Sequence, residues 1–167
     1  MKNFFKFTFV TSSPEHTGAL AVTTSQALRA GIVILLSGQL GTGKSVFARH
    51  LIRHLLTSNE SDEDIPSPTY TLIQTYQGQE YEIWHADLYR LQSVDEIIEL
   101  GLEEAFYTNL CVVEWGDKLE HFTPTDALNI QFEYNAGSSS TRTVIMTTTH
   151  PELGRELTKL FAANKQH

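Results

Sequence analysis

The sequence is poor in cysteine, in long apolar runs and in basic residues, and each shortage excludes a class of protein. Its one cysteine, Cys111, allows no internal disulfide and lies in the apolar run 110–113, as a small core residue would. No run of about 18 apolar residues is present, so no membrane span is expected. The aromatic segment 4–9 is interrupted by Lys6 and Thr8, which argues against a signal peptide or an anchor. These features predict a protein of the reducing cytoplasm.

Basic residues are outnumbered. The chain has 12 Lys and Arg against 20 Asp and Glu, a formal charge of -8 at pH 7 and a pI near 5.3. A surface that binds nucleic-acid phosphates directly gains its affinity mostly from Lys and Arg. We therefore expect no direct nucleic-acid surface, and any RNA involved would be held by a partner.

The order of predicted elements indicates an α/β fold. With 167 residues, 41% of them hydrophobic, the chain is long enough for one sizeable core, and residues 1–167 are expected to form one domain. Apolar runs and alternating patterns predict strands at 4–10, 32–36, 71–77, 80–87, 110–114, 127–134 and 142–148. Helical spacing and capping signals predict helices from 14 to about 30, from 44 to 56, from 93 to 101 and from 151.

Strand pairing follows from the connections. Short turns are expected to join 71–77 to 80–87, and 127–134 to 142–148, as antiparallel hairpins. The continuous apolar run 32–36 is typical of a parallel strand covered on both faces. The central sheet is thus predicted to be mixed, mostly parallel and flanked by helices, while the polar and acidic segment 59–68 is predicted to be a surface loop.

One segment carries a strong chemical signal. Gly38-Gln39-Leu40-Gly41-Thr42-Gly43-Lys44-Ser45 matches G-x-x-x-x-G-K-[ST] between a predicted strand and a predicted helix. The glycines let successive N–H groups point at an anion, and the positive end of the following helix reinforces them. Lys44 is expected to reach the β- and γ-phosphates, and the Ser45 hydroxyl to ligate magnesium. The pattern predicts a P-loop hydrolase that binds ATP and Mg²⁺.

Such a loop needs a carboxylate to complete the magnesium shell or to orient the attacking water. Asp87 and Glu114 each end a predicted strand, where ligands gather in open α/β sheets. Either residue taken alone is also consistent with an exposed acid at a loop entrance. The sequence leaves open which of the two contacts the metal directly and which acts through water.

Weaker signals have two interpretations each. His50 and His54 are spaced to share a zinc ion, but no third ligand lies nearby. Arg90 suits either an ion pair with Asp87 or a contact to the γ-phosphate. Trp115 suits either stacking on a base or covering the edge of the core.

Across its whole length the chain resembles the TsaE family of small bacterial ATPases. Four blocks carry the resemblance in order: 38–45, Ser67-Pro68-Thr69-Tyr70-Thr71-Leu72, His85-Ala86-Asp87-Leu88-Tyr89-Arg90 and Val113-Glu114-Trp115. The second and third are not general P-loop features, so they identify the family far more specifically than the glycine loop does. The resemblance implies a mixed-sheet P-loop fold, with ATP and Mg²⁺ as ligands and the proteins TsaD and TsaB as partners.

The resemblance also implies roles for single residues. Ser45 would ligate the metal, Asp87 and Glu114 would be essential to hydrolysis, and Thr69 with Thr71 would belong to a switch loop. The edges of the nucleotide pocket would include Ser13 and Arg142. Gln39 stands where the family usually has Asp, and Pro66 where a Lys often precedes the Ser-Pro-Thr block.

The implied function is a Mg-dependent ATPase that acts with TsaD and TsaB in the threonylcarbamoyladenosine modification of tRNA position 37, contacting tRNA only through the complex. ATP would order the loop 67–72, and turnover without partners is expected to be slow. Three alternatives remain. A small-molecule or nucleotide kinase would usually carry an arginine-rich lid, which is absent; a GTPase would need an Asn-Lys-x-Asp block, also absent. A non-enzymatic nucleotide-binding module is the third.

Overall fold

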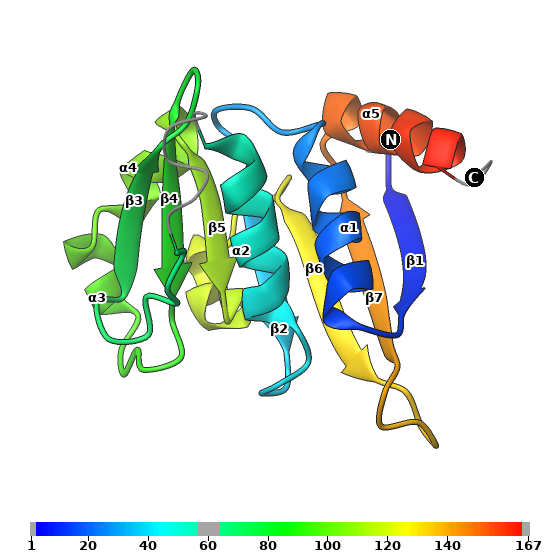
Figure 1. The fold of residues 1–167 in the computed structure, drawn as a ribbon. Coiled ribbons are helices and arrows are strands. Elements are labelled where there is room, and N and C mark those ends of the chain that lie inside the picture. Colours follow the sequence, from blue (N-terminus) through cyan, green and yellow to red (C-terminus); the bar gives the residue numbers. More distant parts are fainter. Residues whose placement is uncertain (1–2, 57–63, 165–167) are drawn as a thin grey trace.

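The computed structural model describes residues 3–56 and 64–164, which build one seven-stranded sheet with helices on both faces (Figure 1). The strands are β1 Phe5–Thr11, β2 Val33–Gly38, β3 Ile73–Gln77, β4 Glu82–Asp87, β5 Leu110–Glu114, β6 Leu128–Tyr134 and β7 Arg142–Thr148. The helices are α1 Pro14–Ser25, α2 Lys44–Leu55, α3 Asp95–Glu99, α4 Leu102–Thr108, the 3-10 helix η1 Gly116–Phe122 and α5 Pro151–Asn164.

The strands lie in the order β1-β7-β6-β2-β5-β4-β3. The central strands β6, β2, β5 and β4 are parallel to one another, whereas β7 and β3 run the other way beside them. Since β1 is antiparallel to β7, five of the seven strands share one direction. The prediction of a mixed, mostly parallel sheet flanked by helices is confirmed, as are both antiparallel hairpins.

Two predicted strands begin later than expected. The Leu72 N–H donates to the Pro68 carbonyl at 2.7 Å and Leu72 has a φ of 65°, so a turn occupies residues 68–72 and β3 starts only at Ile73. The Gly78 N–H donates to the Tyr81 carbonyl at 3.0 Å, which delays β4 to Glu82. Of the predicted loop 59–68, residues 59–63 lie outside the described residues, and 64–68 have no regular structure.

Helix predictions were wrong at two places. The first helix ends at Ser25 rather than near residue 30, because the Thr24 and Ser25 hydroxyls bond to carbonyls of the preceding turn and tight turns follow. Gly101, with a φ of 72°, does end a helix, but a second short helix, α4, begins directly after it. Neither α4 nor η1 was predicted, since both are too short for a clear periodic pattern.

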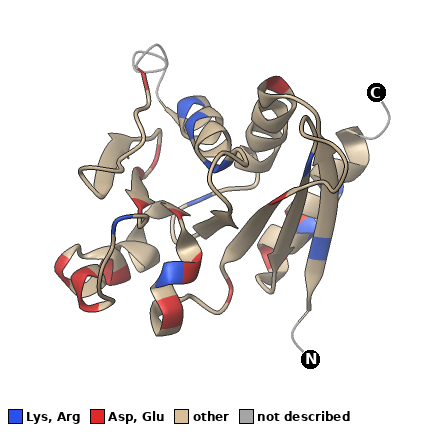
Figure 2. Ribbon diagram, turned by 90° about the horizontal axis from the view of Figure 1, so that it is seen from below, with Lys and Arg blue, Asp and Glu red and all other residues tan. Residues whose placement is uncertain are grey.

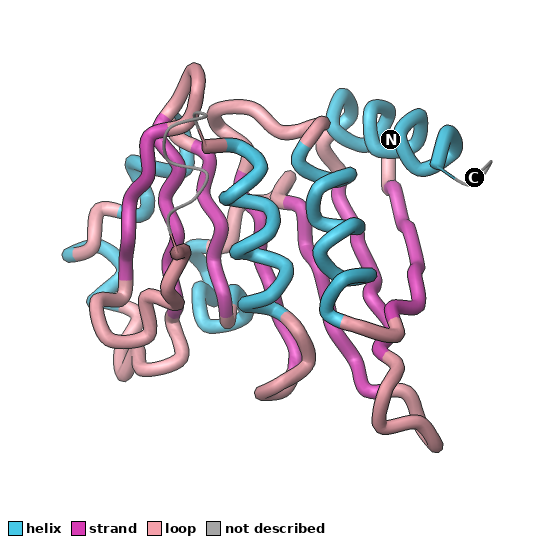
Figure 3. The backbone as a smooth tube through the Cα atoms, viewed as in Figure 1, coloured by secondary structure: helices cyan, strands magenta, loops and turns pink. Residues whose placement is uncertain are grey.

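Two hydrophobic layers hold the sheet. Helices α1, α2 and α5 cover one face, where Ile34 and Leu36 of β2 pack with Phe47 of α2 (Figures 1 and 3). On the other face Val33 and Leu35 of the same strand pack with α3, α4 and η1. Because β2 buries both sets of side chains, its sequence is an unbroken apolar run instead of an alternating one.

Charge is distributed unevenly around this core. Acidic residues gather on α3 and α4, which together carry Asp95, Glu96, Glu99, Glu103 and Glu104 (Figure 2). That side of the molecule is unsuited to nucleic-acid phosphates. Within residues 3–56 and 64–164, no helix combines the length and apolar character that crossing a membrane requires.

Candidate functional site

The loop 38–45 joins the carboxyl end of β2 to the start of α2, on the face that α1 and α2 cover (Figure 1). Gly38 and Gly43 have φ angles of 134° and 111°, which residues with a side chain rarely adopt. A Cβ on Gly38 would lie 2.4 Å from the Phe132 carbonyl oxygen on the neighbouring strand β6. Glycine is therefore required at position 38 by both the backbone path and the neighbouring strand, and at position 43 by the backbone path.

Lys44 opens helix α2 and turns back over the loop. Its ammonium donates to the carbonyls of Gly38 at 2.7 Å and Gln39 at 2.9 Å, and lies 4.1 Å from the centre of the Trp115 ring. Burial lowers the pKa of Lys44, while the Glu114 and Asp87 carboxylates oppose that shift. This puts a fixed cation at the mouth of the loop, where an anion would bind.

Glu114 at the end of β5 is buried, and both of its carboxylate oxygens have partners. Oε2 accepts a hydrogen bond from the Ser45 hydroxyl at 2.6 Å, and Oε1 lies 2.9 Å from Nε2 of His85 on β4. The interpretation of Glu114 as an exposed acid is wrong. The hydrogen bond from Ser45 instead joins the last residue of the glycine-loop pattern to the acid that ends the buried strand β5.

Asp87 at the end of β4 is the register partner of Glu114, and it too is buried rather than exposed. Its Oδ2 accepts hydrogen bonds from the hydroxyls of Ser67 at 3.1 Å and Thr69 at 2.8 Å, and its Oδ1 accepts from the Tyr89 N–H at 2.9 Å. The 67–72 segment is thereby tied to the strand that carries the second acid.

These groups surround one cavity of about 290 Å³. Its lining is Leu40, Gly41, Gly43, Lys44, Ser45, Val46, Ser67, Thr69, Asp87, Tyr89, Glu114 and Trp115. The loop N–H groups and Lys44 suit an anion, and the oxygens of Ser45, Asp87 and Glu114 suit a hard cation such as magnesium. Phosphate chemistry with a divalent cation fits this combination of donors.

A second cavity, of about 270 Å³, adjoins the same loop on the α1 side and is lined by Ser13, Thr42 and Arg142 among others. Arg142 lies 4.2 Å from the centre of the Tyr134 ring and donates to the carbonyls of Ser139 and Thr141. The structure thus places both predicted pocket-edge residues beside the loop.

Some candidates lie apart from the cavity. Thr71 is exposed in the 68–72 turn, and Gln39 is exposed at the loop tip; neither lines the cavity of about 290 Å³. Arg90 lies 5.2 Å from the centre of the Tyr70 ring, and no ion pair joins it to Asp87 in the described part of the chain. The pairing expected as one alternative for Arg90 is therefore wrong.

The two histidines of α2 do not face a common ligand. His50 packs against α1, with ring atoms 2.8 Å from the position a Cβ of Gly18 would take. His54 lines another cavity beside Arg29 and Tyr81. Among the described residues, no group of three His, Cys, Asp or Glu side chains is arranged to hold a metal ion.

Sequence reasoning named His85, Ser67 and Tyr89 only as members of the family blocks and gave none of them its own role in the site. The first two are partners of the acids, and Tyr89 lines the cavity with its ring 5.1 Å from that of Trp115. A signal for His85 was present, because it lies two residues before Asp87 and side chains at that spacing share one face of a strand.

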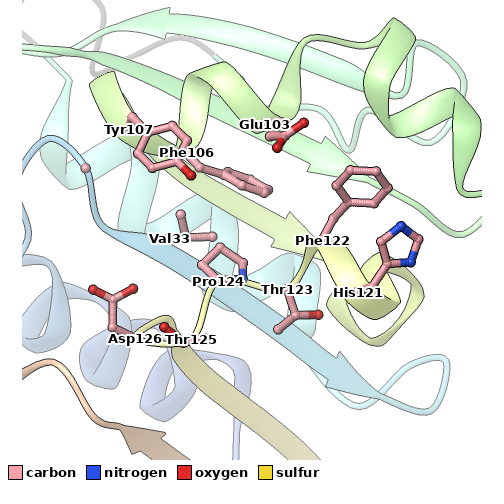
Figure 4. Close-up of a pocket in the computed structure, with 11 residues that line it drawn as sticks. Val33, Glu103, Phe106, Tyr107, His121, Phe122, Thr123, Pro124, Thr125 and Asp126 are labelled. Carbon is pink, nitrogen blue, oxygen red and sulfur yellow. The ribbon is translucent and has the colours of Figure 1, made fainter.

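Another cavity, beside the sheet's other face, lies away from the glycine loop (Figure 4). Its volume is about 440 Å³, and α4 and the segment 121–126 line it with Phe106, Tyr107, Phe122, Glu103 and Asp126. The lining contains neither lysine nor arginine. The lining has two acids and one histidine, His121, and without lysine or arginine it does not suit a phosphate, so this cavity does not compete for that role.

Comparison with known proteins agrees with this geometry. A family model described as threonylcarbamoyl adenosine biosynthesis protein TsaE matches residues 11–144. The tRNA threonylcarbamoyladenosine biosynthesis protein TsaE of Rickettsia conorii is 38% identical over 145 residues, which cover 87% of this chain and 80% of that protein. The protein of the same name from Bacillus subtilis is 35% identical over 121 residues, covering 72% and 73%.

A solved structure shows the same arrangement of elements. The crystal structure of Bacillus subtilis YdiB superposes with a TM-score of 0.76 at 25% identity, over 97% of this chain and 98% of that one. The family match spans most of the chain, and both relatives share more than a third of their aligned residues with it. The chain therefore belongs to the TsaE family of threonylcarbamoyl adenosine biosynthesis proteins.

Proposed function

We propose that this chain is a cytoplasmic, magnesium-dependent ATPase that acts with the TsaD and TsaB proteins in the threonylcarbamoyladenosine modification of tRNA position 37. The observation that carries the proposal is the 2.6 Å hydrogen bond from Ser45 to Glu114. It joins the phosphate-loop pattern to a buried strand-end acid, with Asp87 on the adjacent strand, as metal-assisted phosphate chemistry requires. The names of the relatives from Rickettsia and Bacillus support the assignment to tRNA modification.

Each group has a role in this proposal. The N–H groups of 38–45 and the Lys44 ammonium bind the phosphates, and Ser45, Asp87 and Glu114 hold the metal directly or through water. Magnesium, when bound there, would supply positive charge that offsets the negative charge of the phosphates. Trp115 and Tyr89 form an aromatic wall on one side of the cavity.

The loop 67–72 acts as a switch. Ser67 and Thr69 both donate to Asp87, so any change in what Asp87 binds alters the contacts that hold this loop. Tyr70 of this loop is 85% exposed, with the Arg90 guanidinium 5.2 Å from its ring centre, and a partner protein can reach it. The nucleotide state would thereby change the surface offered to TsaD and TsaB.

Slow turnover without partners is part of the proposal. Among the residues that the structure describes, no arginine lines the cavity of about 290 Å³, and an arginine that stabilises the transition state is worth several orders of magnitude in rate. A purified chain that alone hydrolyses roughly 10 ATP per second or more would contradict this point. Transfer of phosphate to a small acceptor would instead support a kinase.

A reconstitution tests nucleotide, partners and pathway together. TsaD, TsaB, tRNA, a threonylcarbamoyl donor and Mg-ATP are mixed with wild-type chain, with Lys44→Ala or with Lys159→Ala, and modified tRNA is counted. Lys159 is an exposed residue of α5 whose one ion pair among the described residues is with Glu156, so its variant is the control. We expect modification with wild type and Lys159→Ala and its loss with Lys44→Ala. Full modification with Lys44→Ala would refute the proposal.

A further inference from the structure

His85 is a completely buried histidine that the proposed function does not yet use. It lies in the interior of β4, and its Nε2 is 2.9 Å from Oε1 of Glu114. Its Nδ1 is buried and has no hydrogen-bond partner among the described residues. A buried imidazole is costly unless it is hydrogen-bonded, so the contact with Glu114 is the interaction that favours histidine over an apolar residue here.

The direction of this hydrogen bond follows from its partners. An ionised carboxylate only accepts, so Nε2 carries the hydrogen and donates it to Glu114. Glu114 then accepts from two sides, from His85 at Oε1 and from the Ser45 hydroxyl at Oε2. Two donors on opposite oxygens fix the rotation of a carboxylate, which one donor alone does not.

A role in proton transfer does not fit His85. Its side chain is fully buried and does not line the cavity, so a substrate there has no contact with either ring nitrogen. The side-chain contact by which His85 reaches the site is its hydrogen bond to Glu114.

We propose that His85 is a positioning residue: its Nε2–H holds the Glu114 carboxylate so that Oε2 stays on Ser45, and this alignment sets the affinity of the site for the divalent cation. The inference rests on the proposed function, because it presumes a metal beside Ser45. Groups that orient metal ligands in this way typically change metal affinity about 10–100-fold when they are removed.

Two amide substitutions separate this role from simple packing. In His85→Gln the side-chain nitrogen stands near the position of Nε2, whereas in His85→Asn it stands near the position of Nδ1, out of reach of Glu114. Both variants put a polar amide in the same buried site. Asn is one methylene group shorter than Gln and leaves more empty space, a difference that thermal unfolding measures, and the two variants also differ in the hydrogen bond to Glu114.

Binding of Mn²⁺ in the presence of a non-hydrolysable ATP analogue is the measurement, followed by electron paramagnetic resonance. We expect His85→Asn to weaken Mn²⁺ binding about 10–100-fold and His85→Gln to retain most of the affinity. Affinity for the analogue without metal should stay unchanged in both variants. Thermal unfolding identifies any variant that fails to fold. If His85→Asn fails to fold, the test depends on His85→Gln, which must retain its Mn²⁺ affinity. A His85→Gln variant that folds normally but loses Mn²⁺ affinity would overturn the proposal.

A double-mutant cycle with Glu114→Gln shows whether the effect passes through Glu114. If it does, adding His85→Asn to Glu114→Gln should change Mn²⁺ affinity little further. Equal losses in both backgrounds, or unchanged affinity in His85→Asn, would overturn the inference while leaving the proposed function standing. A wild-type chain that binds neither nucleotide nor Mn²⁺ would refute the proposed function, and this inference with it.

Discussion

Replacing Gly38 with alanine tests how strictly the glycine loop depends on the sheet behind it. The added Cβ would lie 2.4 Å from the carbonyl oxygen of Phe132 and 3.2 Å from its Cβ. Gly38 and Phe132 are register partners on the parallel strands β2 and β6. Since the closest atom belongs to the backbone, relief requires the two strands to move apart rather than a side chain to rotate.

Two penalties combine at this position. Holding an alanine at positive φ costs about 1–2 kcal/mol. Forcing an extra carbon into a packed site costs about 1–3 kcal/mol more. We therefore expect the free energy of unfolding to fall by about 2–5 kcal/mol, a large share of the roughly 5–15 kcal/mol by which domains are stable.

Gly137→Ala is the matched control. Gly137 also has a positive φ, 82°, but nothing lies within 4 Å of the position its Cβ would take. It should lose only the conformational part, about 1–2 kcal/mol.

Urea unfolding followed by circular dichroism measures both variants, and nucleotide binding is measured on the folded protein. Gly38→Ala should be the less stable variant and should bind nucleotide more weakly, while Gly137→Ala should bind normally. Equal losses of stability in the two variants would refute the argument that the β2–β6 contact determines glycine at position 38.

Three further predictions follow from single contacts. Burial raises the pKa of Cys111 to about 12, so a thiol reagent at pH 8 should leave the native protein unlabelled and react with one thiol after unfolding; rapid native labelling would contradict this burial. Because Lys44 lies over the Trp115 ring, nucleotide binding should change tryptophan fluorescence, and the change should vanish in Trp115→Phe but persist in Trp84→Phe. A Cβ on Gly154 would lie 2.1 Å from the Phe5 ring, at a crowding cost of about 1–3 kcal/mol against roughly 1 kcal/mol gained in helix propensity. Gly154→Ala should therefore lower stability with nucleotide affinity unchanged, and a raised urea midpoint would contradict that close approach.

Local sequence patterns were sufficient to predict much of the fold. The apolar runs of β2 and β5, the alternating hairpin β6–β7 and the start of α2 at Lys44 were predicted because each depends on residues close in sequence. Short elements were not predicted. The helices α4 and η1 are held by packing on the sheet, and the late start of β3 depends on a turn at Leu72 that no periodic pattern reveals.

The candidate site divides in the same way. The sequence by itself determined the glycine loop, since conformational freedom at Gly38 and Gly43 and the positions of Lys44 and Ser45 are properties of one continuous segment. It also identified Asp87 and Glu114 as strand-end acids, but left open what each one contacts.

Only the tertiary structure decided those contacts. The parallel register of β4 and β5 sets Asp87 beside Glu114, and the packing of α2 on the sheet brings Ser45 to Glu114 from 69 residues away. His85, on β4, reaches the remaining carboxylate oxygen of Glu114, Oε1, in the same way. Such pairings depend on strand order and register. Both arise from burial of the whole core, so no local sequence pattern indicates them.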